Sequence, residues 1–184
     1  SKRDPAGHVQ VFCLDMAGGE ARQLTQAQAD ISDFAWSPEG KRLAYVTAFD
    51  ESAACRRGVH EPKLHNQPCH RRLWLQDLPA GEPEIVSEDK LSVFDFAWSP
   101  DGKRIALFTA AEPGVGPGYW QADLQVLELE SGRLKLLAKG CGSSKLQWSD
   151  DGKRIAFLSP PGAKVPRPAV VSAKGGPLDQ PGRE

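Results

Sequence analysis

The segment from Cys55 to His70 gathers residue types that could bind a metal or form a disulfide. It holds two cysteines and three histidines within sixteen residues. Thiolate sulfur and neutral imidazole nitrogen are ligands that zinc prefers. Structural zinc sites usually carry two cysteines about two to four residues apart or two histidines about three to five apart. Only His60 and His65 come near that spacing.

Three interpretations of this segment stay open. We favour a plain surface loop, place a Cys55–Cys69 disulfide second, and place zinc third. The zinc alternative would use Cys55, His60, His65 and Cys69 as ligands. The expectation for the whole chain is therefore no metal and no other cofactor. The other two cysteines, Cys13 and Cys141, are expected to be ordinary small thiols, buried or half-buried.

The chain contains no Gly-x-Ser-x-Gly pentapeptide, the strained turn that presents a serine nucleophile in α/β-hydrolases. The nearest segment, Gly140-Cys-Gly-Ser-Ser144, has its serines at other positions. Unplaced Ser, His and Asp residues are expected in any chain of this size. We predict no catalytic residue and no hydrolase activity for this chain alone.

The elements that would position any site come from an internal repeat. Three stretches share one pattern, and the first two agree at nine of eleven positions. They are Phe34-Ala-Trp-Ser-Pro-Glu-Gly-Lys-Arg-Leu-Ala44, Phe96-Ala-Trp-Ser-Pro-Asp-Gly-Lys-Arg-Ile-Ala106 and Leu146-Gln-Trp-Ser-Asp-Asp-Gly-Lys-Arg-Ile-Ala156. Pro100 and Asp101 suit the centre of a type I turn, and Gly102 suits the left-handed residue that follows. The pattern predicts a β-hairpin, because Ser-Pro-Asp-Gly would break a helix at its centre.

A second motif predicts two further strands joined by a glycine turn. Val11–Thr25 aligns without gaps on Leu73–Ser87, and Gln125–Leu137 follows the same plan with a tighter turn. The two motifs together make a four-stranded meander, as in a β-propeller blade. The tryptophans Trp36, Trp98 and Trp148 recur at intervals of 62 and 50 residues. The longer interval indicates an insertion, from about residue 50 to 70.

The strand count predicts an all-β chain made of about three and a half four-stranded antiparallel blades. Residues 1–184 form one partial propeller domain. Within it, residues 8–25 supply the outer half of a blade, 31–87 a blade with the insertion, 92–138 a blade, and 144–178 an incomplete blade. Propellers close with about four blades or more, so the ring is expected to be incomplete and the chain to be a fragment or one arc of a larger assembly. Unpaired strand edges at both ends predict self-association.

The repeat and the Gly-Gly-Glu-Ala-Arg-Gln-Leu-Thr stretch ending at Thr25 resemble blades of TolB-type propellers. The same blades form the N-terminal propeller of prolyl oligopeptidase family serine peptidases, including the dipeptidyl-peptidase and acylaminoacyl-peptidase types. The resemblance implies a non-catalytic propeller that gates access to an α/β-hydrolase domain absent from this chain. The alternative it implies is a TolB-like propeller that binds another protein and has no enzymatic activity.

Aromatic residues give the candidate contacts. The fixed place of the three repeated tryptophans predicts packing between adjacent blades. Tyr119 and Trp120 lie outside the repeat, in a Gly-Pro-rich loop from Pro113, and are candidate contacts for a protein or peptide partner. The alternative is that they cover the edge of a blade.

Composition narrows the partners and the location. The formal net charge is −1, and no basic bias points to nucleic acid. The Lys-Arg pairs that start at Lys41, Lys103 and Lys153 recur at one hairpin position and are expected to be solvated strand starts. No run approaches the about 18 apolar residues of a membrane span. The resemblance favours a periplasmic or secreted location over the cytoplasm.

Overall fold

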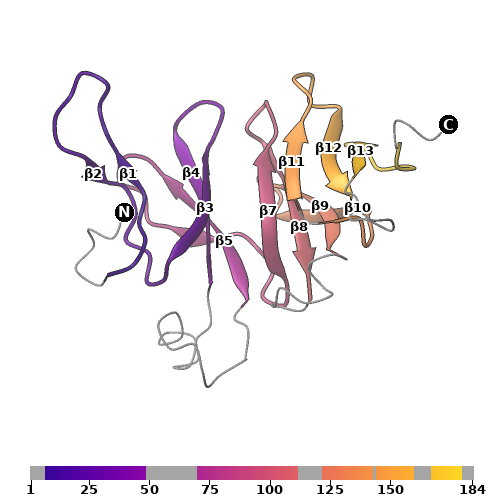
Figure 1. Cartoon of the computed structure of the whole chain (residues 1–184), viewed down its shortest axis with the longest axis horizontal. Coiled ribbons are helices and arrows are strands. Elements are labelled where there is room, and N and C mark those ends of the chain that lie inside the picture. Colours follow the sequence, from indigo (N-terminus) through magenta and orange to yellow (C-terminus); the bar gives the residue numbers. More distant parts are fainter. Residues whose placement is uncertain (1–6, 49–69, 112–121, 143, 160–166, 180–184) are drawn as a thin grey trace.

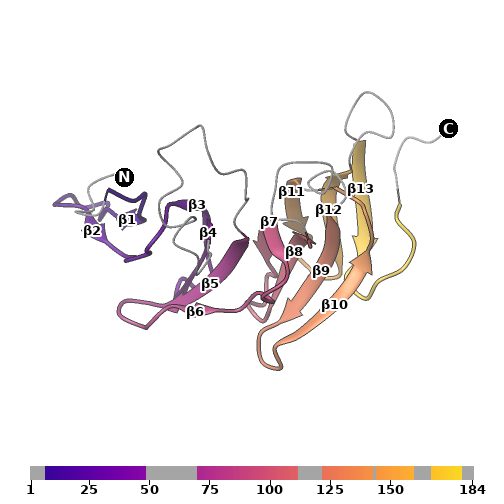
Figure 2. The ribbon, with the colours of Figure 1, turned by 90° about the horizontal axis from the view of Figure 1, so that it is seen from below.

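The repeated sequence folds into four successive antiparallel sheets, shown in Figures 1 and 2. The structure is a computed structural model that describes residues 7–48, 70–111, 122–142, 144–159 and 167–179. Within these residues all regular structure is β-strand or turn, and no sheet closes on itself. The all-β prediction and the incomplete ring are therefore confirmed.

The strands follow chain order inside every sheet, so each sheet is a simple meander. The first sheet contains β1 (Phe12–Cys13) and β2 (Arg22–Gln23). The second contains β3 (Ile31–Trp36), β4 (Arg42–Ala48), β5 (Arg71–Asp77) and β6 (Glu84–Ile85). The third contains β7 (Ser92–Trp98), β8 (Arg104–Ala110), β9 (Asp123–Glu128) and β10 (Arg133–Ala138). The fourth contains β11 (Ser144–Trp148), β12 (Arg154–Ser159) and β13 (Arg167–Ser172).

The hairpin between the first two strands of a sheet is built by its serine. Ser99 accepts the Arg104 backbone N–H at its Oγ, at 3.0 Å, and donates from the same hydroxyl to Asp101 at 2.5 Å. Gly102 has a φ of 66°, the left-handed conformation that suits glycine. The expected turn is confirmed, and Ser149 with Asp151 repeats it in the fourth sheet at 2.6 Å.

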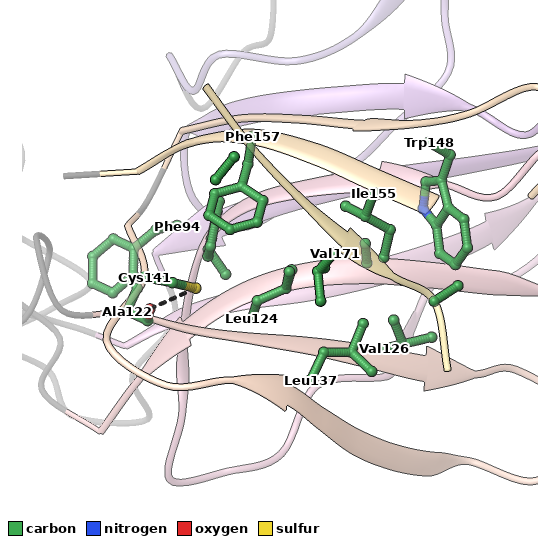
Figure 3. Close-up of a cluster of buried hydrophobic side chains, with 14 residues drawn as sticks. Phe94, Ala122, Leu124, Val126, Leu137, Cys141, Trp148, Ile155, Phe157 and Val171 are labelled. Atoms are coloured by element: carbon green, nitrogen blue, oxygen red, sulfur yellow. Dashed lines mark hydrogen bonds between the residues drawn. The ribbon is translucent and has the colours of Figure 1, made fainter. Parts of the chain in front are cut away.

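The core lies between successive sheets rather than inside one of them. Figure 3 shows the cluster between the third and fourth sheets, with Phe157 and Leu124 among its members. In this cluster the Phe108 and Phe157 rings meet edge to face, with their centres 5.5 Å apart. A second cluster joins the second and third sheets around Leu107, and a third joins the first two sheets around Tyr45. Each sheet is thus stabilised by apolar surface that the next sheet covers.

The two cysteines expected to be small thiols behave as predicted. Cys141 is buried and Cys13 is half-buried, and both are free. Figure 3 shows the Cys141 thiol beside Ala122, whose carbonyl oxygen it approaches at 3.8 Å. Burial raises the pKa of the Cys141 thiol to about 11, because the thiolate would lose its hydration there.

Candidate functional site

The first strands of the second, third and fourth sheets gather along one edge of the arc. β7 lies in contact with both β3 and β11. Each of these strands carries an irregularity in its pairing at the same place, before its tryptophan: after Ile31, after Val93 and after Ser144. Bulges re-aim side chains and interrupt pairing at sheet edges. The common edge therefore presents side chains that a regular strand would not.

The residue three positions before each tryptophan lies at this bulge. Asp33, Asp95 and Lys145 are equivalent in the repeat, and Lys145 has a φ of 62°. The Asp95 carboxylate accepts the Phe96 backbone N–H at 2.8 Å and the Leu146 backbone N–H at 3.2 Å. Asp95 thus ties the third sheet to the bulge of the fourth.

Burial raises the pKa of Asp95, because the charged carboxylate loses hydration at this position. The hydrogen bonds from Leu146 and Phe96 act in the opposite direction, and the negative charge of Asp33 adds to the increase. An acid with a raised pKa on an edge is the kind of group that marks functional sites. The same group also has a structural role here, because it joins two sheets.

A serine and a histidine meet at the start of β7. His70 Nδ1 lies 3.2 Å from Ser92 Oγ, which also accepts the Arg71 backbone N–H at 3.1 Å. A histidine next to a serine hydroxyl is the first requirement for a serine nucleophile. Ser92 is 0% exposed, however, so its hydroxyl cannot meet a substrate. The pair links β5 to the next sheet.

A similar arrangement, a histidine beside a side-chain oxygen that accepts a backbone N–H, occurs one repeat earlier. His8 Nδ1 lies 3.7 Å from Asp30 Oδ1, which accepts the Val9 backbone N–H at 2.7 Å. His8 and His70 are 62 residues apart, the interval that separates Trp36 from Trp98. The histidine therefore recurs in the first two copies of the second motif, and no histidine follows His70 in the sequence. Extending the alignment of the second motif by three residues towards the N-terminus identifies it from sequence, and our sequence analysis missed it.

Arg71 completes a polar cluster at this end of the sheets. Its Nη2 donates to Ser32 Oγ at 2.9 Å, and its guanidinium carbon lies 6.0 Å from the centre of the Phe94 ring. At this end of the sheets β4 and β8 end, and β5 and β9 begin. The insertion, between β4 and β5, and the Gly-Pro-rich loop, between β8 and β9, therefore attach to the sheets at this end. We call His70, Arg71, Ser92, Phe94 and Asp95 the edge cluster.

The site residues predicted in those two loops lie outside the described residues. They are Cys55, His60, His65, Cys69, Tyr119 and Trp120. Their predicted roles stay predictions. Among the residues that the structure does describe, no group of three His, Cys, Asp or Glu side chains is placed to hold a metal ion.

Two of the three repeated tryptophans, Trp98 and Trp148, pack between sheets as predicted, whereas Trp36 is 44% exposed. The Trp148 indole N–H donates to the Ala97 carbonyl of the third sheet at 3.0 Å, and the Trp98 indole N–H donates to Ala35 of the second at 3.4 Å. In return, the guanidinium carbon of Arg104 lies 4.8 Å from the centre of the Trp148 ring. Stacking of a guanidinium on an indole is a favourable cation–π contact.

The expectation that the Lys-Arg pairs are solvated strand starts is wrong for two of the arginines. Arg42 lies 5.1 Å from the centre of the Trp98 ring and donates to the Gly102 carbonyl at 2.8 Å. Arg104 donates to Gly152 in the same way, at 3.3 Å. The long side chains reach across to the next sheet, which sequence distance alone does not reveal. In each set of contacts, the arginine of one sheet stacks on the tryptophan of the next sheet and donates to its glycine carbonyl, while the tryptophan donates to an alanine carbonyl of the first sheet. We call this set of contacts the sheet junction.

No helix among the described residues is long and apolar enough to cross a membrane.

No protein-family model matches the chain. Three relatives are similar in sequence, and two of them are named as peptidases. Dipeptidyl-peptidase 5 of Porphyromonas gingivalis is 25% identical over 135 residues, covering 70% of this chain and 18% of that protein. The uncharacterized protein YidR of Escherichia coli is 33% identical over 108 residues, covering 56% and 21%. The uncharacterized peptidase YuxL of Bacillus subtilis is 27% identical over 112 residues, covering 51% and 17%. The chain spans about a fifth of the length of these relatives.

Solved structures show which fold the four sheets belong to. The putative TolB from Agrobacterium tumefaciens superposes with a TM-score of 0.68 at 16% identity, covering 95% of this chain and 56% of that one. TolB from Acinetobacter baumannii gives 0.66 at 19% identity, covering 93% and 37%. The β-propeller domain of the trilobed protease from Pyrococcus furiosus gives 0.58 at 13% identity, covering 93% and 48%. The chain is therefore a β-propeller segment whose repeats are similar to those of TolB and of peptidase propeller domains.

Proposed function

We propose that the chain is a non-catalytic propeller segment of a serine peptidase, which limits substrate access to a hydrolase domain outside the described residues. Two of the three relatives reported above are named as peptidases, and the similarity runs over the propeller repeats. Such a segment surrounds the entrance to the active site and contributes loops that contact the substrate, while the catalytic residues belong to another domain.

The observation that carries the proposal is the burial of Ser92. Among the described residues, Ser92 is the serine whose hydroxyl lies against a histidine. The hydroxyl contacts His70 Nδ1 and accepts the Arg71 backbone N–H, and both contacts join β7 to the preceding sheet. A nucleophile must reach a bound carbonyl carbon and must have an oxyanion hole beside it. A hydroxyl with 0% exposure does not meet the first of these needs. The Ser-His pair therefore supports a role in holding sheets together.

The edge cluster supports the proposal that a gate lies at this end of the sheets. Loops on a rigid scaffold carry recognition in many proteins, and the two long connections of this chain attach beside Arg71 and Asp95. We infer that Tyr119 and Trp120, in the second connection, contact the peptide or protein that this end of the propeller receives. Aromatic side chains are the residues that most often anchor such contacts.

A second candidate is a propeller that binds another protein and works without a hydrolase domain. The relative with the highest identity of the three, YidR, is not named as a peptidase. In this case the same end of the sheets would bind a folded protein, and the segment would need no gate.

Two measurements separate these candidates. The coding sequence after Glu184 is determined first: a Gly-x-Ser-x-Gly followed by Asp and His supports the peptidase, and a stop after further repeats supports the interaction propeller. The 184-residue chain is then incubated with p-nitroanilide and ester substrates. Turnover that a serine-directed inhibitor abolishes, and that Ser92→Ala removes, would overturn the non-catalytic assignment.

A further inference from the structure

Two side chains of the third sheet, Thr109 of β8 and Gln125 of β9, carry buried oxygen atoms without a partner. Thr109 Oγ1 and Gln125 Oε1 form no hydrogen bond within the described residues, although both atoms are buried. Thr109 as a whole is 2% exposed. The strand register pairs Leu107 with Gln125 and Thr109 with Asp123, so Thr109 and Gln125 are diagonal neighbours on one face of the sheet. Two buried oxygens that have lost their hydration therefore lie on adjacent strands.

This face packs on the second sheet. Leu107 and Leu127 belong to the same face, and both are members of the buried cluster that joins the second and third sheets. Both sheets that enclose the pair are thus among the described residues. The burial of the two oxygens does not depend on an end of the chain.

The second sheet shows how the same two positions are used one repeat earlier. Thr47 lies 62 residues before Thr109, and Trp74 has the place in the strand register that Gln125 has in the third sheet. The Trp74 indole N–H donates to Thr47 Oγ1 at 2.9 Å. A direct hydrogen bond therefore spans this diagonal in the second sheet.

The replacement of tryptophan by glutamine changes both the size and the polarity at this diagonal. A glutamine side chain is smaller than an indole side chain by more than about 30 Å³, the volume that one water molecule takes in the liquid. A buried water needs two to four polar partners. It can donate one O–H to a carboxamide oxygen and the other to a hydroxyl oxygen, which are the two groups that lack a partner here.

We propose that Thr109 and Gln125 bind one internal water molecule between the second and third sheets. The water donates to Gln125 Oε1 and to Thr109 Oγ1, and it takes the place that the indole N–H has in the preceding repeat. Each of the two buried oxygens thereby gains its missing partner. The inference does not depend on the proposed function, because it concerns the interior of the sheets and not the edge cluster.

A crystal structure of the 184-residue chain that resolves ordered water tests the site directly. We expect one density peak within about 2.5–3.0 Å of both Thr109 Oγ1 and Gln125 Oε1. The matched control is the Thr47–Trp74 pair, where no peak is expected between the two side chains because they bond directly. A direct hydrogen bond from the Gln125 amide to Thr109 would overturn the proposal, and so would the lack of a peak at this place.

A double-variant cycle tests the same site in solution. Thr109→Val and Gln125→Met keep the approximate size of each side chain and remove its hydrogen-bonding group. Each single change leaves the water and the remaining oxygen short of a partner, so each should lower the urea midpoint of unfolding. The double variant should lower the midpoint by less than the sum of the two shifts, because the water and both of its partners are then removed together.

Thr47→Val combined with Gln125→Met is the matched control pair. The same types of residue are exchanged, but Thr47 lies in the second sheet and bonds to Trp74, so the two shifts should add. Additive shifts for the Thr109 and Gln125 variants would overturn the proposal. A higher midpoint for Thr109→Val alone would also overturn it, because that result means that the hydroxyl is buried without any partner.

Discussion

The guanidinium carbon of Arg104 lies 4.8 Å from the centre of the Trp148 ring, across the boundary between the third and fourth sheets. The indole N–H of Trp148 crosses the boundary in the other direction, to the Ala97 carbonyl. Each of the two residues therefore contacts a group of the neighbouring sheet: Arg104 contacts the Trp148 ring, and Trp148 contacts the Ala97 carbonyl. Since Arg42 and Trp98 repeat this arrangement, it is a property of the repeat.

Trp148→Ala should lower the free energy of unfolding by about 3–5 kcal/mol, the usual cost of deleting a large buried aromatic side chain. Trp148 is 6% exposed, whereas the equivalent Trp36 is 44% exposed. Trp36→Ala is thus a matched control and should cost well under half as much. Urea unfolding followed by circular dichroism measures both. Equal losses for the two variants would show that Trp148 does not hold the fourth sheet in place.

Trp148→Phe separates packing from hydrogen bonding at the same position. The phenyl ring keeps most of the apolar contact but cannot donate to Ala97, so a loss of about 1 kcal/mol is expected. The measurement is the same urea titration. A loss as large as that of Trp148→Ala would mean that the indole shape, and not the hydrogen bond, determines the contribution.

The repeat made these tryptophan contacts predictable, but not their arginine partners. A side chain at a fixed place in each repeat can be expected to meet the same neighbour each time, which is why packing between blades was predicted. The role of Arg42 depends on a carbonyl 60 residues away in the sequence, at Gly102. The histidines were missed for a different reason, because the alignment was ended at Val11 although His8 and His70 keep the same 62-residue interval.

Arg104→Ala should lower the free energy of unfolding by about 1–2 kcal/mol, through loss of the stacking on Trp148 and of the hydrogen bond to Gly152. Arg154→Ala is the matched control, because this equivalent arginine is exposed. It should change stability by less than about 0.5 kcal/mol. Thermal or urea unfolding of both variants checks the difference, and equal effects would contradict a role for Arg104 in the junction.

Asp101→Asn tests the hairpin through its pH dependence. Partial burial acts to raise the pKa of Asp101, but hydrogen bonds from Ser99 and the Lys103 backbone, with the charge of Arg104, outweigh burial and hold the pKa below its usual value of 3.8. The ionised carboxylate thus stabilises the fold. This contribution is complete above the usual pKa and is lost as the pH falls through the lower value of the folded state.

The variant should therefore be less stable than the wild type by about 1 kcal/mol at neutral pH, and the difference should shrink in strong acid. Asp150→Asn is the control in the equivalent turn of the fourth sheet, since the carboxylate hydrogen bonds of that turn go to Asp151, the equivalent of Asp101, and not to Asp150. Urea titrations from neutral to acidic pH give both values. A difference that grows on acidification would show the opposite sign and exclude this account.

Cys141 and Cys13 should differ in their reaction with a thiol reagent. A Cys55→Ser/Cys69→Ser variant leaves only these two thiols, since the chain has four cysteines. With a pKa of about 11, Cys141 is ionised in roughly one molecule per thousand at pH 8, and burial also blocks the reagent. Cys13 is half-buried at the edge of the two-stranded first sheet and should react first. Peptide mapping by mass spectrometry assigns each modification, and denaturant should release the second thiol. Modification of both thiols at one rate in the native state would mean that the Ala122 side of the core opens far more readily than its packing indicates.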